Sequence, residues 1–203
     1  MPRWIWAAAA LLALGLITSS AFGVVKNILP LNRVLASQQL IFVAKVEKML
    51  PDKPAMVLVA GDALKGKVPF ARMPVNLEGD NEGKREKHPE AILKRLAAGS
   101  EIIFFVAKLG DNYEAFGFTN GTWFQMIGQG DKPENVKWSF THCEPYLRRT
   151  FKGTTAELKK VVADGLSGKK APPKPDEKEP PGLGPELKAD DKPKDAPAVK
   201  GGQ

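Results

Sequence analysis

A two-residue turn between two aromatic runs constrains the fold of this chain most. In "FGFTNGTWFQMI" (residues 116–127), Asn120 and Gly121 separate two apolar segments. Both residues tolerate positive φ, which a type I′ turn requires, so the stretch predicts a β-hairpin. The turn sets Phe118 opposite Trp123, and such an aromatic pair stabilises a hairpin by up to about 1 kcal/mol. At least part of the chain is therefore expected to be antiparallel sheet.

Other short apolar runs, separated by turn residues, are expected to extend this sheet. Leu40–Leu50 begins apolar and then alternates, and Ala55–Gly66 follows it after the turn signal "PDKP". Glu101–Leu109 is strongly apolar throughout, which favours a central strand. In the weaker run "PFARMPVNLEG", Pro74 favours a strand at a sheet edge.

Two helices are expected among these strands. The first, His88–Gly99, has a proline in its first turn and a glycine at its end. The second begins at the capping box of Thr154 and Glu157 and ends near Gly165. Before the first helix, residues 78–88 alternate in charge sign, which is typical of a solvated loop.

These elements predict an α+β, mostly β fold: a small barrel with an inserted helix and a C-terminal helix. The runs "IFVAKVEKML" and "AMVLVAGDALKG" resemble the OB-type barrel of netrin-like domains, in which a strand "hFxGxVxxh" precedes one ending "xxLKG". The resemblance covers roughly Leu40–Ile127 and implies an OB-like barrel. With a single cysteine, this chain lacks the paired cysteines of the secreted animal members, so their protease-inhibitor activity does not carry over.

The N-terminal segment has the pattern of an export signal. Arg3 precedes an apolar run from Trp4 to Ile17, and small residues suit cleavage after Ala21. Residues 1–21 are thus expected to be a signal peptide. The alternative is an uncleaved membrane anchor, because residues 4–25 carry no charge and are long enough to span a bilayer.

The C-terminal segment differs in composition from the rest. Residues 167–203 are rich in Pro, Lys and acidic residues and contain no aromatic side chain. Such a segment buries too little apolar surface to offset its chain entropy, so a disordered tail is expected. Residues 22–166 remain as the globular, barrel-like domain.

Charge and cysteine content restrict the classes of function. The formal net charge is +7, but the globular part has only a mild basic excess, unlike the dense basic stripe of nucleic-acid modules. Specific nucleic-acid binding is therefore not expected. The single cysteine excludes an intramolecular disulfide.

Reactive side chains concentrate in "FTHCEPYLRRTF" (residues 140–151), which allows two interpretations. His142, Cys143 and Glu144 would be the centre of an enzyme or a metal protein. However, zinc needs three or four ligands, and catalytic Cys/His pairs usually come from separate segments. Alternation from Val136 instead places His142 at the end of an apolar strand face, followed by a helix start. We therefore assign no catalytic residue, metal or cofactor.

Candidate ligand-binding residues come from the aromatic strands and the basic pair beside them. They are Trp123, Trp138, His142, Arg148 and Arg149. Aromatic strand faces of OB-type barrels bind oligosaccharides, although such side chains also form barrel cores. Arg148 and Arg149, with Lys152, would attract polyanions weakly.

These observations favour an exported, non-enzymatic binding or structural module of the bacterial cell envelope, in the periplasm or secreted. With its leader and Pro/Lys tail, the chain also resembles exported bacterial proteins. The expected partner is an envelope protein or polymer, and a membrane only if the leader is uncleaved. The alternatives are the enzyme or metal protein at His142, Cys143 and Glu144, and a weak polyanion or oligosaccharide binder.

Overall fold

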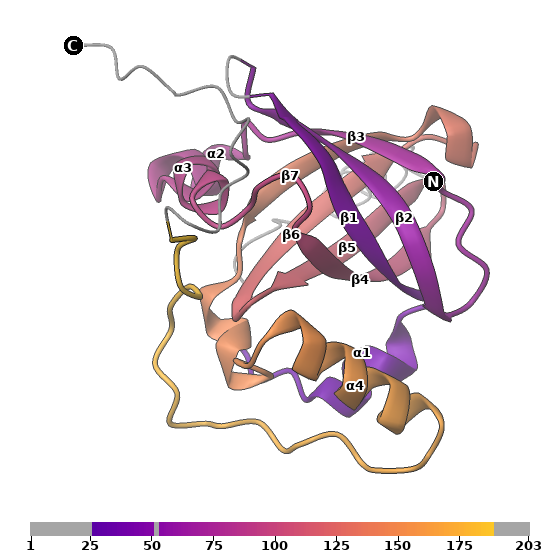
Figure 1. Cartoon of the computed structure of the whole chain (residues 1–203), viewed down its shortest axis with the longest axis vertical. Coiled ribbons are helices and arrows are strands. Elements are labelled where there is room, and N and C mark those ends of the chain that lie inside the picture. The colour runs from indigo at the N-terminus through magenta and orange to yellow at the C-terminus, as the bar shows by residue number, and fades with distance from the viewer. Residues whose placement is uncertain (1–25, 51–52, 189–203) are drawn as a thin grey trace, which may run out of the picture.

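The computed structural model describes residues 26–50 and 53–188. Within them, seven strands form a closed barrel in the order β1-β2-β3-β7-β6-β5-β4 (Figure 1). The strands are β1 (Leu40–Leu50), β2 (Ala55–Lys65), β3 (Arg72–Asn76), β4 (Glu101–Leu109), β5 (Asn112–Thr119), β6 (Thr122–Gln129) and β7 (Lys137–Cys143). The predicted mostly β, α+β barrel is confirmed, with more strands than the five of an OB barrel.

Antiparallel pairing joins every pair of neighbouring strands except one. Strands β3 and β7 run parallel, and only Val75 with Trp138 and Asn76 with Ser139 are paired between them. The predicted hairpin is confirmed as β5 and β6, with Phe118 opposite Trp123. Asn120 and Gly121 form its turn with φ of 40° and 80°.

The strongly apolar runs are explained by burial on both sheet faces. One cluster fills the barrel interior and includes Phe42 and Phe104. A second cluster lies on the outside of the same strands and includes Ile41 and Phe105. Strands β1 and β4 therefore contribute successive residues to two cores, which is why their sequences do not alternate in their first halves.

Two helices cover the outer cluster. Helix α1 (Leu31–Ser37) and helix α4 (Thr155–Leu166) lie side by side at one end of the barrel (Figure 1). Their buried side chains join the outer cluster, among them Val34 and Leu158. The predicted capping box of Thr154 and Glu157 is present at the start of α4.

The inserted helical region differs in detail from the expectation. It consists of two short helices, α2 (Asn81–Arg85) and α3 (His88–Leu93), in place of one helix from 88 to 99. The charged loop expected before His88 folds as α2 because Asp80 accepts a hydrogen bond from Gly83 N at 2.7 Å and caps the helix. Gly83 packs against the carbonyl of Thr141 in β7, where a side chain would clash.

The predicted side-chain alternation on β7 is wrong at its end. The pairing of β6 with β7 has a register shift between Phe124 and Met126, which is a bulge or similar irregularity. Beyond it, Cys143 joins Phe140 in the barrel interior. His142 contacts carboxylates and belongs to neither apolar cluster. Pro145 begins the predicted helical turn, the 3-10 helix η2 (Pro145–Arg149); another, η1 (Pro133–Asn135), precedes β7.

The segment after α4 follows the barrel surface. Residues 167–188 form neither helix nor strand, but hydrogen bonds tie them to the barrel, so this part of the predicted disordered tail is ordered. Asp176 N donates to Arg149 O at 2.8 Å, and Leu187 N donates to Lys94 O at 3.0 Å. Composition gave no sign of this attachment, because backbone groups and charges provide it. We call residues 167–188 the strap.

The predicted leader lies outside the described residues. This holds for the signal peptide at residues 1–21, for its alternative as an anchor at residues 4–25, and for the end of the tail at residues 189–203. Among the helices that are described, none is long and apolar enough to cross a membrane.

Helix α1 depends on a cation from β2. The last turn of this short helix has no basic residue of its own. The ammonium group of Lys65 donates to the carbonyls of Leu35 and Gln38, both at 2.6 Å, and to that of Ala36 at 3.4 Å. A positive charge at a helix C-terminus satisfies carbonyls and opposes the helix dipole.

We expect Lys65→Met to lower the free energy of unfolding by about 1–3 kcal/mol, because charged hydrogen bonds to the C-terminal carbonyls of α1 are lost. Urea unfolding followed by tryptophan fluorescence measures the change. The matched control is Lys67→Met, since Lys67 is exposed and two residues away. Equal stability of the two variants would show that Lys65 does not support α1.

Candidate functional site

The structure does not gather the five sequence-derived binding residues into one site. Trp123 is buried in the outer cluster, where its indole Nε1 donates to Phe151 O at 2.8 Å. His142 is fully buried. Trp138 lines one cleft, whereas Arg148 and Arg149 line another.

His142 lies between two carboxylates. Its Nδ1 is 2.8 Å from Asp80 Oδ2, and its Nε2 is 3.2 Å from Glu144 Oε1. Glu144 is also fully buried, and Asp80 is partly exposed. With an acceptor at each ring nitrogen, the geometry fits an imidazolium that donates both of its protons.

Asp80 links this buried cation to the inserted helices. Its backbone N–H donates to Thr141 O at 2.9 Å, and one carboxylate oxygen caps α2 while the other meets His142. Asp80 therefore fixes α2 to the end of β7, with one contact to α2 and two contacts to β7. The role of His142 that follows from these contacts is to join parts of the fold.

The pKa values of the two histidines shift in opposite directions. Burial lowers the pKa of His142, but its hydrogen bonds to Glu144 and Asp80 outweigh that effect and raise the pKa above its ordinary value. Burial, together with the charge of His142, lowers the pKa of His88. His88 Nδ1 accepts a hydrogen bond from Cys143 N at 3.1 Å, which requires this nitrogen to be unprotonated.

Cys143 is a buried thiol in the barrel interior. Burial raises the pKa of Cys143 to about 12; Glu144 adds to the rise and the charge of Arg95 opposes it. A thiolate, which is the nucleophilic form, is therefore strongly disfavoured. No group of three or more His, Cys, Asp or Glu side chains across 26–50 and 53–188 has the arrangement of a metal site.

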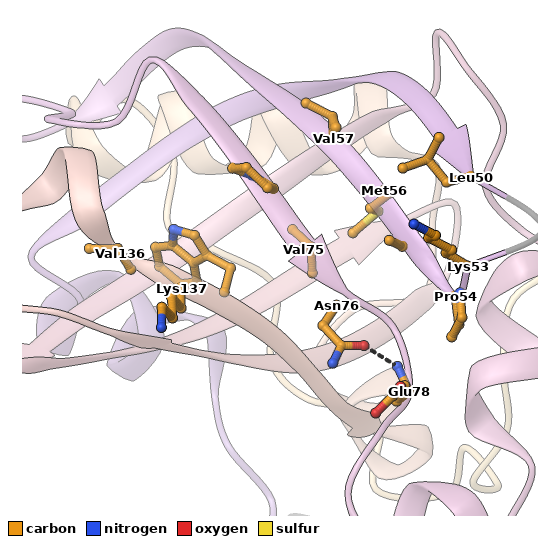
Figure 2. Close-up of a pocket in the computed structure, with 13 residues that line it drawn as sticks. Leu50, Lys53, Pro54, Met56, Val57, Val75, Asn76, Glu78, Val136 and Lys137 are labelled. Carbon is orange, nitrogen blue, oxygen red and sulfur yellow. Dashed lines mark hydrogen bonds between the residues drawn. The ribbon is translucent and has the colours of Figure 1, made fainter.

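A cleft of about 580 Å³ runs along β2, β3 and β7. Figure 2 shows Val57, Val75 and Asn76 on neighbouring strands, with Val136 and Lys137 on the far side of the cleft. The cleft follows the β3–β7 seam, by which we mean the two residue pairs that join these strands. Short pairing at the seam leaves the rest of β3 without a strand partner on that side.

The cleft has an apolar floor and a charged rim. Met56, Val75 and Trp138 line its inner part and are almost fully buried. Lys53, Lys137 and Glu78 are exposed around it. Above them, the partly buried Val57 and the exposed Pro74 offer apolar contact, and both signs of charge lie at the edge, which is the usual anatomy of a protein-binding surface.

No family model, curated protein or solved structure matches this chain. The resemblance to netrin-like domains therefore stays a prediction from sequence motifs.

Sequence reasoning missed Asp80 and most of the cleft. An aspartate three residues before a glycine in a polar segment is a weak helix-capping signal, and its pairing with His142 depends on a contact across 62 residues. The cleft residues Met56 and Val75 have only the pattern of ordinary strand residues. Their shared position arises from the parallel pairing of β3 with β7, for which the sequence has no local signal.

We expect His142→Gln to lower the free energy of unfolding by about 3–5 kcal/mol at pH 6, because two carboxylates lose their buried cation. The raised pKa of His142 gives stabilisation that is fully present below the unfolded value of 6.5 and is lost as the pH rises through the folded value. The difference between the two proteins should therefore shrink above neutral pH. Denaturant unfolding from pH 5.5 to 9 measures it.

A difference between wild type and His142→Gln that does not depend on pH would contradict the charged state of His142. Asp80→Asn is a second variant, which keeps the size of the side chain but removes one of the two charges. It should show a smaller loss of stability with the same direction of pH dependence. His88, whose pKa is lowered, is present in all of these proteins, so it contributes to the pH dependence of stability in each of them.

Cys143 should not react with a disulfide reagent such as DTNB at pH 8 in the folded protein, because its pKa is about 12 and its side chain is buried. It should react within minutes in 6 M guanidinium chloride. Rapid modification of the folded protein would revive the cysteine-enzyme alternative.

Proposed function

We propose that this protein is an exported, non-enzymatic module of the bacterial cell envelope that binds an extended segment of another envelope protein. The observation that carries the proposal is the cleft along β2, β3 and β7, with its apolar floor and charged rim. The leader and the Pro/Lys tail support export and an envelope location.

The form of the cleft supports an extended protein segment as the ligand. The cleft runs beside β3, and Arg72–Pro74 in that strand are paired with β2 but not with β7. A strand with one unpaired side can receive a further extended chain. Pro74 has no N–H group, so side-chain contacts with the apolar floor must supply much of the affinity.

The enzyme alternative has less support from the geometry. His142 and Glu144 are fully buried and hydrogen-bonded to one another, and Cys143 is a buried thiol with a raised pKa. A catalytic group must reach its substrate, and these side chains are buried. Their contacts instead explain how the inserted helices attach to the barrel.

The test is a photo-crosslinking experiment in the native cell envelope. A photo-reactive amino acid replaces Lys137, which is exposed at one side of the cleft. We expect one discrete protein adduct. Val57→Glu should reduce it about tenfold, because a charge enters the apolar part of the cleft and a loss of about 1.4 kcal/mol has that effect.

Val59→Glu is the matched control. Val59 lies in the same strand and is 38% exposed, but it does not line the cleft. The adduct should persist in this variant. Absence of any adduct at Lys137, or equal loss in the Val57 and Val59 variants with folding intact, would overturn the proposal.

A further inference from the structure

Three cations converge on one residue of the strap. Arg148 donates from Nε and Nη2 to Glu179 Oε1 at 3.1 and 2.9 Å. Lys152 Nζ donates to Glu179 Oε2 at 2.6 Å. Arg149 Nε donates to the backbone carbonyl of Glu179 at 3.0 Å. Glu179 thus presents three oxygen atoms, each to a different cation.

The place where Glu179 meets the three cations is partly enclosed. The side chains of Glu179 and Arg148 are only 12% and 19% exposed. A cleft of about 430 Å³ adjoins them and is lined by all three cations and by Lys174. Partial burial strengthens each charged contact relative to one in open water.

Positive charge exceeds the negative charge that the strap supplies. Glu179 and Asp176 are the acidic partners of Arg148 and Lys152. The guanidinium of Arg149 instead bonds a neutral carbonyl and stacks over Tyr146, with 5.5 Å to the ring centroid. Among the ion pairs of the described residues, none includes Arg149.

We propose that Arg148, Arg149 and Lys152 form a binding site for a phosphate group, and that Glu179 occupies this site as an internal competitor. A phosphate has several oxygen atoms around one centre and can accept from three cations at once, as Glu179 does with its carboxylate and carbonyl. Its greater negative charge would also reach Arg149, which Glu179 meets only through a neutral oxygen.

The strap is suited to release this site. It has no regular secondary structure, and around Glu179 two backbone hydrogen bonds hold it: Asp176 N to Arg149 O and Gly182 N to Pro145 O. A phosphate ligand would displace the Glu179 side chain and leave the barrel unchanged. The ligand binds only those molecules in which Glu179 has left the site. Its apparent affinity is therefore the intrinsic affinity multiplied by that free fraction.

The test measures binding of fluorescently labelled inorganic polyphosphate to the purified chain by anisotropy at low salt. Wild type should bind weakly. Glu179→Gln should bind about tenfold more tightly, which corresponds to a site that is about nine-tenths filled in wild type. Adding Arg149→Gln to Glu179→Gln should remove this gain, and rising salt should weaken binding.

Glu186→Gln is the matched control. Glu186 is also a strap residue and pairs with Lys94 and Arg95, outside the cation site. It should leave polyphosphate binding at the wild-type level. The proposal is overturned if Glu179→Gln, with an unchanged circular dichroism spectrum, binds no more tightly than Glu186→Gln.

A parallel arm distinguishes the source of the phosphate. Vesicles of phosphatidylglycerol replace polyphosphate in a sedimentation assay with the same variants. A gain by Glu179→Gln on vesicles alone supports a lipid headgroup, and a gain on polyphosphate alone supports a soluble polymer. No gain on either probe rejects the site. This proposal is independent of the β2–β3–β7 cleft.

Discussion

Burial of β1 and β4 on both faces is the constraint on which the rest of the structure depends. Phe42 and Phe104 require a filled barrel interior, and Ile41 and Phe105 require a cover outside. A sheet with one solvated face cannot satisfy both demands, so the barrel closes and α1 and α4 cover its outer cluster. The remaining, more exposed elements are arranged around these two apolar clusters.

Charges hold the peripheral segments to the core. Lys65 binds the end of α1, His142 holds α2 through Asp80, and Glu179 joins the strap to η2. Each attachment joins segments that are distant in sequence, and each segment is too short or too polar to be held by apolar burial alone. At Glu179, the charges that attach the strap are also those for which we propose that a phosphate competes.

The features that could be predicted are the local ones. The Asn120–Gly121 turn and the capping box of Thr154 depend on neighbouring residues, and both are present. Long-range features could not be predicted: the parallel pairing of β3 with β7 and the bulge that redirects His142 depend on contacts between distant segments. The strap was also missed, because composition measures apolar content and not the fit of one glutamate residue to three cations.

The β3–β7 seam has a consequence for the order of folding. The β5–β6 hairpin closes over two turn residues, whereas the seam joins Val75 to Trp138, with the inserted helices and three strands between them. Loop-closure entropy delays such distant pairing until the intervening chain is compact. We therefore expect the seam to close late in folding, so that Val75 and Trp138 lie at an open sheet edge before it forms. Until β7 docks, the unpaired edge of β3 is the place where another extended chain would attach and start aggregation.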